Sequence, residues 1–168
     1  MSQLQRYTGR RVLVTGGGSG IGQASVLRIL AEGGRVVAAD ISAAGLRDTV
    51  AKAGDAGERL HTVVVDISEE ESVRAGVTDA IRWLGGLDTL VNAAGVLRSA
   101  HFEQTTLAEF EQILRINLVG TFLVTRESIP ALRPGTGPAV VNFSSTVGGV
   151  RASLQCPRTP RRRPVSRR

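Results

Sequence analysis

Short runs of apolar, mostly β-branched residues alternate with longer segments of helical spacing from residue 11 to residue 143. This alternation is the pattern of repeated βαβ units, and strands that are buried on both faces of a parallel sheet read as continuous apolar runs. The runs are Arg11–Thr15, Arg35–Asp40, His61–Asp66, Leu87–Asn92 and Ala139–Phe143. The sequence therefore predicts an α/β fold, with a doubly wound parallel sheet of about five strands and helices on both faces.

The segments between these runs carry signals for the ends of helices. Ser68 with Glu71, and Thr106 with Glu109, match the capping box, in which two side chains satisfy amides of the first helical turn. Glycines supply the expected helix ends. They lie at Gly33-Gly34, Gly54 and Gly85-Gly86.

Length and composition indicate one ordinary globular domain. The 168 residues are 42% apolar and 21% charged, which excludes a disordered or fibrous chain. The apolar stretches are too short to span a bilayer, Met1 is not followed by a secretory signal, and the single Cys156 excludes an internal disulfide. His61 and His101 have no further ligands at metal spacing. We expect a cytoplasmic protein without a membrane segment or a metal site.

The net charge of +6 is confined to one end of the chain. Residues 1–150 hold 14 basic and 15 acidic residues, a net charge of −1, whereas residues 151–168 hold seven arginines and no acid. We therefore expect residues 1–150 to form the domain and residues 151–168 to form a basic, disordered tail.

The first apolar run leads directly into a glycine-rich turn that precedes a helical segment. Glycines allow positive φ angles and a close approach to a pyrophosphate, and the following helix offers unpaired amides and the positive end of its dipole. A tight turn without a ligand has the same composition, but the position between first strand and first helix favours a dinucleotide. The residues that we expect at the cofactor are Thr15, Gly16, Ser19, Gly20, Ile21 and Gly22.

Asp40 ends the second run, 18 residues after Gly22. A carboxylate at this point accepts hydrogen bonds from the hydroxyls of the adenine-side ribose and repels a 2′-phosphate. The neighbouring Ile41 offers no positive charge that would rescue the phosphate. The sequence therefore favours NAD over NADP, with a solvated loop aspartate as the alternative.

These features, with the Asn92-Ala93-Ala94-Gly95 turn and the segment Val140–Ser145, make residues 10 to about 150 resemble the short-chain dehydrogenase/reductase family. The TGxxxGxG spacing and the NAAG turn are specific together. The resemblance implies a Rossmann-type sheet, with Asp66 and Ile67 beside the adenine. It also implies that the NAAG turn supports the sheet and lines the cofactor.

The family transfers a hydride between a nicotinamide cofactor and an alcohol or carbonyl carbon, using a tyrosine, a lysine, a serine and an asparagine; for this chain, Asp40 makes NAD(H) the expected cofactor. Ser145 matches the serine that polarises the substrate oxygen, and Asn117 matches the asparagine that holds a relay water. Asn117 lies in a predicted helix over Leu107–Leu132, on an otherwise apolar stripe with Phe110, Ile113, Leu114 and Thr121. A polar group on a buried stripe needs a partner, such as a main-chain group or a water.

The tyrosine and the lysine of the family are missing from this chain. Arg158 and Arg162 stand at their positions, and the only tyrosine and lysine are Tyr7 and Lys52. An arginine stays protonated and cannot replace a phenol as acid and base. We therefore expect this chain to be a truncated, inactive form of an NAD-dependent enzyme.

Two hypotheses explain the basic tail. In the first, the tail is the family sequence read in the wrong frame: codons that begin at the third base of the printed codons from Arg158 onward can encode Y-A-A-S-K-A-G-V, which contains the family's YxxxK motif. In the second, the tail is genuine and the protein is a non-catalytic nucleotide- or nucleic-acid-binding module. No aromatic residue interleaves the arginines, so we favour a small-molecule substrate over nucleic acid.

Members of the family continue through a further helix and two further strands, and they assemble as homo-dimers or homo-tetramers. We therefore expect one side of the sheet to be exposed in this chain, with low stability as the consequence.

Overall fold

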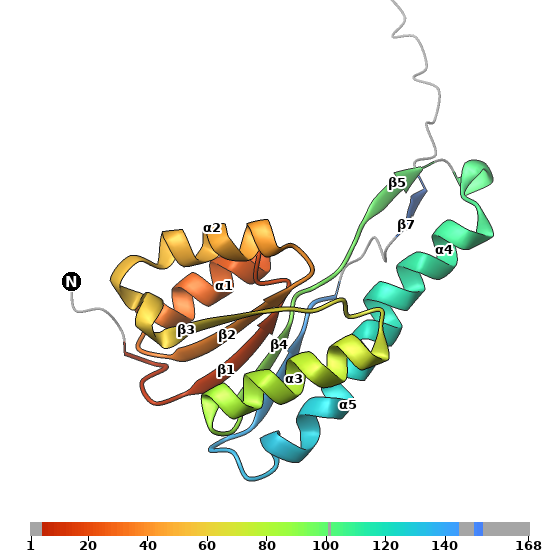
Figure 1. Ribbon diagram of the computed structural model, residues 1–168. Helices are drawn as coiled ribbons and strands as arrows, with labels where there is room; N and C mark the ends of the chain where they lie inside the picture. The colour runs from red at the N-terminus through yellow and green to blue at the C-terminus, as the bar shows by residue number, and fades with distance from the viewer. Residues whose placement is uncertain (1–4, 101, 145–149, 153–168) are drawn as a thin grey trace, which may run out of the picture.

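The computed structural model describes residues 5–100, 102–144 and 150–152. Its main sheet has five parallel strands in the order β3-β2-β1-β4-β6 (Figure 1). The strands are β1 (Arg11–Thr15), β2 (Arg35–Asp40), β3 (Leu60–Val64), β4 (Thr89–Asn92) and β6 (Ala139–Asn142). The prediction of a doubly wound α/β fold is confirmed.

The observed bounds of two strands, β3 and β4, differ from the predicted ones. β1 and β2 have the predicted bounds, whereas β3 ends at Val64 and not at Asp66. The Asp66 amide donates to Ser72 Oγ at 2.9 Å, so the chain has already left the ladder with β2 at this residue. β4 begins at Thr89, two residues after the predicted start at Leu87, although the Asp88 main chain already bonds to both neighbours: Asp88 N donates to Arg11 O at 2.9 Å and Ala139 N donates to Asp88 O at 3.1 Å.

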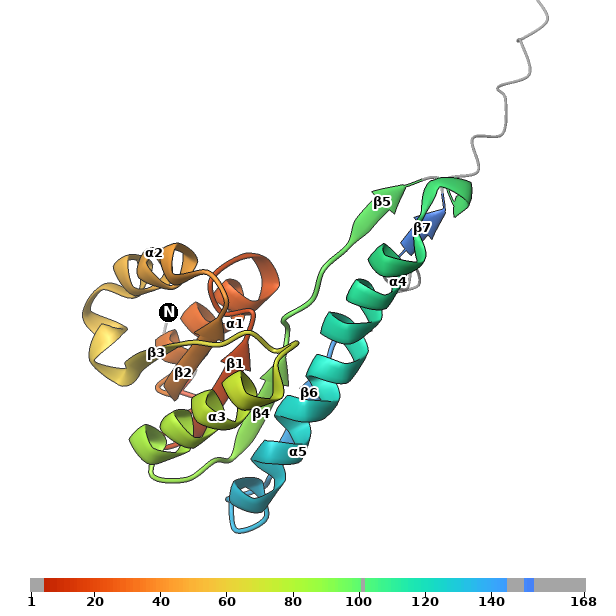
Figure 2. The same ribbon diagram turned by 45° about the vertical axis from the view of Figure 1, so that its right-hand side comes forward.

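The helices are α1 (Gly20–Ala31), α2 (Ala43–Ala53), α3 (Glu70–Leu84), α4 (Leu107–Leu114) and α5 (Thr121–Leu132), with 3₁₀ turns at Gly54–Arg59 and Phe102–Gln104. The expected single helix over Leu107–Leu132 is interrupted by a π-helical segment, Arg115–Gly120, and the three pieces form one long rod (Figure 2). A second, two-stranded sheet pairs β5 (Arg98–Ala100) with β7 (Val150–Ala152). Arg151 and Ala152, which we assigned to the tail, therefore belong to a strand.

Successive residues of the central strand point to opposite faces of the sheet, and each face has its own apolar core. Val12 and Val14 pack with Val26 and Leu46 under α1 and α2. Leu13, between them, packs on the other face with residues of α3 and α5. The helices α1 and α2 thus cover one face and α3 and α5 the other (Figure 1).

Most of the predicted signals for helix ends are confirmed, and one is wrong. Thr106 and Glu109 form the capping box of α4, and Gly54 and Gly85 follow the ends of α2 and α3 with positive φ angles, as predicted. The capping box at Ser68 is wrong. The Asp66 carboxylate accepts from the amide and the hydroxyl of Ser68 at 2.9 and 2.7 Å, and α3 begins later, at Glu70, without a side-chain cap.

The apolar stripe predicted on the last helix is only partly buried. Ile113 is buried, but Phe110 and Leu114 are 45% and 39% exposed, so the prediction is wrong for these two residues. Both residues belong to α4, the part of the rod that extends beyond the main sheet (Figure 2). All four residues of β6 are exposed, as expected for a strand whose ladder in the described residues runs along β4 alone.

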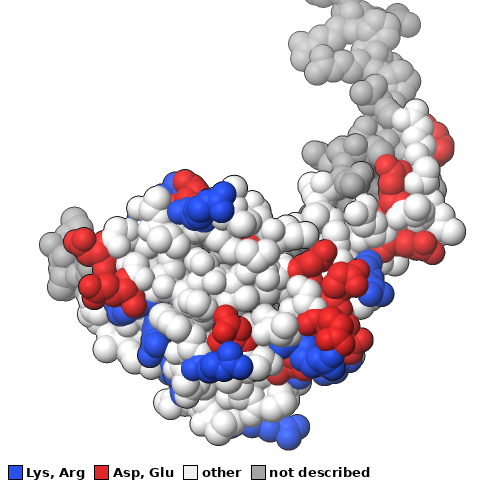
Figure 3. Space-filling view, in the orientation of Figure 1, with Lys and Arg blue, Asp and Glu red and all other residues white. Residues whose placement is uncertain are grey.

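Acidic and basic side chains are interspersed over the face drawn in Figure 3, which agrees with the near-neutral charge of residues 1–150. Among the described residues, no helix is both long enough and apolar enough to cross a membrane.

Candidate functional site

A cavity of about 430 Å³ lies at the carboxyl ends of the parallel strands. This is the edge at which open α/β sheets bind ligands. All the residues predicted to contact the cofactor line it, with the exception of Thr15 and Asn92. Those that do are Gly16, Ser19, Gly20, Ile21, Gly22, Asp40, Ile41, Asp66, Ile67, Ala93, Ala94 and Gly95.

The glycine-rich turn is too tightly packed for side chains at four of its glycines, Gly16, Gly17, Gly18 and Gly22. A Cβ on Gly16, whose φ is +70°, would lie 2.7 Å from the Ala94 nitrogen, and one on Gly22 would lie 2.1 Å from the Gly16 oxygen. The turn thereby brings the start of α1 against the end of β1. Ser19, the N-cap residue of α1, makes no side-chain cap bond, and the first turn of α1 has no acidic residue. The helix start can therefore receive an anion.

Asp40 lies at the edge of the cavity with both carboxylate oxygens oriented by main-chain amides. Gly18 N donates to Oδ2 at 2.9 Å and Ser42 N donates to Oδ1 at 2.8 Å. Each oxygen keeps a lone pair for a further donor. None of the described residues that line the cavity is a lysine or an arginine. A neutral pair of hydroxyls fits this edge better than a phosphate does.

Thr15 and Asn92, the two predicted residues that do not line the cavity, lie buried beneath it. Thr15 Oγ1 accepts from Ala94 N at 3.2 Å. Asn92 Nδ2 donates to Thr125 Oγ1 at 3.0 Å and to Asn142 Oδ1 at 2.8 Å. The two side chains therefore hold the NAAG turn and link β4 to α5 and β6.

Asn117 lies in the π-helical segment and is half-buried. Its side-chain oxygen accepts from Val96 N at 2.8 Å, and its Nδ2 donates to Val96 O at 2.9 Å. The prediction that this side chain has a partner, such as a main-chain group or a water, is confirmed, and the partner is the main chain of Val96. The amide orients the chain just after Gly95, and the neighbouring residue, Ile116, lines the cavity. π-Helical turns within helices often occur at functional sites.

The other positions that correspond to catalytic residues of the family lie outside the described residues, and the single tyrosine and lysine of the chain do not line the cavity. These positions are Ser145, Arg158 and Arg162. Lys52 is on α2, where it contacts Asp48, and Tyr7 donates its amide to Glu32 O next to the end of α1. In the part of the chain that the structure describes, no group of three or more His, Cys, Asp or Glu side chains could hold a metal ion.

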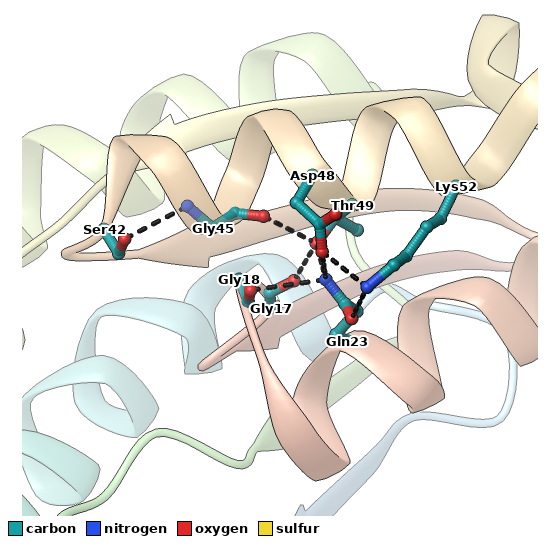
Figure 4. A network of polar contacts seen from close by, with 8 residues as sticks. All are labelled: Gly17, Gly18, Gln23, Ser42, Gly45, Asp48, Thr49 and Lys52. Carbon is teal, nitrogen blue, oxygen red and sulfur yellow. Dashed lines mark hydrogen bonds and ion pairs between the residues drawn. The ribbon is translucent and has the colours of Figure 1, made fainter.

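Two kinds of site residue were not predicted from the sequence. The first kind lines the cavity and consists of apolar neighbours of residues that the family pattern marks: Ala39, Val65, Val96 and Ile116. Gln23 and Thr49 contact the glycine-rich turn from behind (Figure 4). The sequence signal for these contacts behind the turn was the polar Thr49 at helical spacing from the apolar Leu46, three residues earlier. Both residues are buried on α2.

Comparison with known proteins gives a consistent result. A family model described as short chain dehydrogenase matches residues 10–157. Levodione reductase from Leifsonia aquatica is 39% identical over 155 residues, which are 89% of this chain and 57% of that protein. L-fucose dehydrogenase from Bos taurus is 37% identical over 160 residues, 94% of this chain and 57% of that protein.

Solved structures agree with the sequence comparison. A short chain dehydrogenase from Mycobacterium smegmatis has a TM-score of 0.79 at 32% identity, covering 88% of this chain and 62% of that one. The crystal structure of levodione reductase has a TM-score of 0.78 at 34% identity, covering 86% and 59%.

The five-stranded parallel sheet with helices on both faces defines a Rossmann-like α/β protein. Within that class, the chain belongs to the short-chain dehydrogenase/reductase family of oxidoreductases. It spans little more than half the length of the curated relatives that it matches.

Proposed function

We propose that this chain is the cofactor-binding portion of an NAD(H)-dependent oxidoreductase that acts on a small alcohol or carbonyl compound. The observation that carries the choice of NAD is the Asp40 carboxylate, held at the cavity edge by Gly18 N and Ser42 N. The relatives named as a reductase and a dehydrogenase support the reaction class.

Different residues at the cavity would bind different parts of the cofactor. The start of α1, with Ser19 and Gly20, would bind the pyrophosphate through main-chain amides and the helix dipole. Asp40 would accept both hydroxyls of the adenine-side ribose, and its charge would repel a 2′-phosphate. Asp66 and Ile67 would flank the adenine. Bound NAD supplies the hydride-accepting carbon.

The catalytic part of the proposal rests on Ser145 and Asn117. Ser145 would polarise the substrate oxygen, and Asn117 would order the chain around Val96 beside the cofactor. The chain contains no tyrosine other than Tyr7 and no lysine other than Lys52, so it lacks the acid/base pair of the family. We infer that it binds NAD with little or no turnover, and that the tail over residues 151–168 arises from a shifted reading frame.

Cytoplasmic localisation and homo-oligomeric assembly of the full-length form complete the proposal. Reading the bases that encode residues 145–168 tests the shifted frame, because a run that cannot encode Tyr and Lys in either alternative frame rejects it.

Cofactor choice is tested by titrating NAD and NADP into the parent chain and into Asp40→Ala. We expect the parent to prefer NAD by about tenfold or more, and the variant to lose most of that preference because the repulsion of the 2′-phosphate is gone. Asp55→Ala, a change at an exposed aspartate outside the cavity, is the matched control. An unchanged preference in Asp40→Ala removes Asp40 from cofactor choice.

Turnover is tested by NADH formation with a panel of secondary alcohols. We expect NAD binding without measurable NADH formation. A chain that turns over at rates typical of an enzyme contradicts the inferred loss of the acid/base pair.

A further inference from the structure

Two polar side chains contact the glycine-rich turn at Gly17 and Gly18, which do not line the cavity (Figure 4). Thr49 of α2 is fully buried, and its hydroxyl lies 2.8 Å from the Gly17 oxygen. Gln23 of α1 lies with Nε2 3.3 Å from the Gly18 oxygen and 2.8 Å from Thr49 Oγ1. Both carbonyls at the tip of the turn are therefore engaged by side chains from the helices that follow β1 and β2.

The packing at this contact is close. Gly45, one turn before Thr49 on α2, approaches the turn so nearly that a Cβ would lie 2.6 Å from the Gly18 oxygen. On its other side, Gly18 donates its amide to Asp40 Oδ2. Gly18 is thus held at its main-chain N–H by Asp40 and at its main-chain oxygen by Gln23.

The number of protons on each side chain limits which groups can donate and which must accept. The Thr49 hydroxyl has one proton, which it donates to the oxygen of Gly17 or of Gly45, at 2.8 and 3.0 Å, while it accepts from Gln23. Gln23 Oε1 accepts from Lys52 Nζ at 3.0 Å, so the amide nitrogen, with two protons, faces three acceptors: Thr49 Oγ1, Asp48 Oδ2 and the Gly18 oxygen. The hydrogen bond from Lys52 also holds the pKa of Asp48 below its usual value, which keeps this acceptor charged.

The geometry points to Thr49 and Gln23 as positioning residues for the cofactor, an inference that rests on the proposed function. Gly17 and Gly18 do not line the cavity, whereas Gly16, Ser19 and Gly20 on either side of them do. A carbonyl held against α2 cannot turn its negative end toward a bound pyrophosphate. The two side chains therefore keep the turn in the form in which main-chain amides, and not oxygens, face the phosphates.

The central test compares Thr49→Val, Thr49→Ser and Thr62→Val in the full chain. Valine keeps the shape of Thr49 but leaves the Gly17 oxygen without its donor, serine keeps the hydroxyl, and Thr62 lies on β3 away from the cavity. We expect Thr49→Val to weaken NAD and ADP binding about tenfold, and Thr49→Ser to restore it to within about twofold of the parent. Thr62→Val should bind like the parent.

A ligand without phosphates separates positioning from a general loss of structure. Adenosine should bind Thr49→Val and the parent equally, because it does not contact the start of α1. Calorimetric or NMR titration gives both affinities, and a thermal melt of each ligand-free variant shows whether it is folded. Equal NAD affinity in folded Thr49→Val and parent, or failure of serine to rescue, overturns the inference.

Two further measurements keep the inference falsifiable. If Thr49→Val does not fold, Gln23→Met decides: a loss of about threefold in NAD affinity supports the positioning role, and parent-like affinity overturns it. Amide hydrogen exchange of residues 16–22 in the ligand-free chain should be faster in Thr49→Val than in Thr62→Val. A parent that binds neither NAD nor NADP refutes the proposed function, whereas unchanged exchange refutes the role of Thr49 whatever the cofactor result.

Discussion

The two ends of the parallel sheet are built from the same strands and differ in how their polar groups are satisfied. At the amino end, the buried Asp88 carboxylate accepts from Arg11 N, Nε and Nη2 and from Thr136 N, all at 2.8–3.0 Å. At the carboxyl end, Asp40 accepts two amides and keeps free lone pairs, Ser19 leaves α1 without a side-chain cap, and the cavity opens between them.

The difference separates stability from binding. The hydrogen bonds from Arg11 hold the pKa of Asp88 well below its usual range, as expected for a carboxylate whose acceptor capacity is used within the fold. At the other end, Asp40 lines the cavity, and each of its carboxylate oxygens accepts only one main-chain amide among the described residues. Unused hydrogen-bonding capacity costs stability but is what a ligand needs.

The largest effect on this difference between the two ends is expected for Gly22→Ala, at the carboxyl end. The added Cβ would lie 2.1 Å from the Gly16 oxygen, so the turn or α1 must move. We expect NAD affinity to fall by about 100-fold, which corresponds to roughly 2.8 kcal/mol. Gly57→Ala, where a Cβ meets nothing within 4 Å, is the control and should bind normally. Normal NAD binding by Gly22→Ala in a calorimetric titration argues against the turn as the phosphate site.

At the amino end, Asp88→Ala should affect stability and spare binding. The change removes the acceptor of four donors and leaves Arg11 unpaired, which should cost roughly 2–3 kcal/mol of unfolding free energy. Urea denaturation measures the loss. NAD affinity of the folded variant should stay within about twofold of the parent, and a larger loss means that the two ends are coupled.

Glu32, at the end of α1, gives a pH-dependent test. Hydrogen bonds from Arg6 and Arg28 lower its pKa from 4.5 to about 2. Because the folded-state pKa is depressed, the stabilisation is complete above pH 4.5 and is lost as the pH falls toward 2. Glu32→Gln should therefore melt at a lower temperature than the parent at pH 7, and the difference should shrink across that window.

The exposed Glu58→Gln, made in parallel, serves as the control for Glu32 and should melt like the parent throughout. A difference between Glu32→Gln and the parent that stays constant from pH 7 to pH 2 would contradict the ion-pair origin.

The smallest effect is expected for Lys52→Met. The Lys52 side chain is half exposed in its pair with Asp48, and exposed pairs contribute little. The Tm should not change measurably, and NAD affinity should change less than about twofold. A clear loss of affinity would show that Lys52 does more than orient Gln23.

Much of the fold could be predicted because its signals are local. Apolar runs long enough to cross a sheet located β1 and β2 to the residue, and Thr106 with Glu109 marked the start of α4. The error at Ser68 arose because the spacing to Glu71 does not fix the residue at which the helix begins. The amide and hydroxyl of Ser68 donate to Asp66, and α3 begins at Glu70.

The glycine spacing, Asp40 and the NAAG turn by themselves determined which residues would meet at one edge, because parallel strands place their carboxyl ends together. Only the tertiary structure decided which of them face the cavity. Thr15 and Asn92 lie beneath the cavity and hold the NAAG turn and α5 in place. Asn117, in the π-helical segment, bonds to the Val96 main chain. The contact of Thr49 and Gln23 with the turn joins residues 26 positions apart across two helices. Such contacts depend on how helices pack against a sheet, which no local pattern specifies.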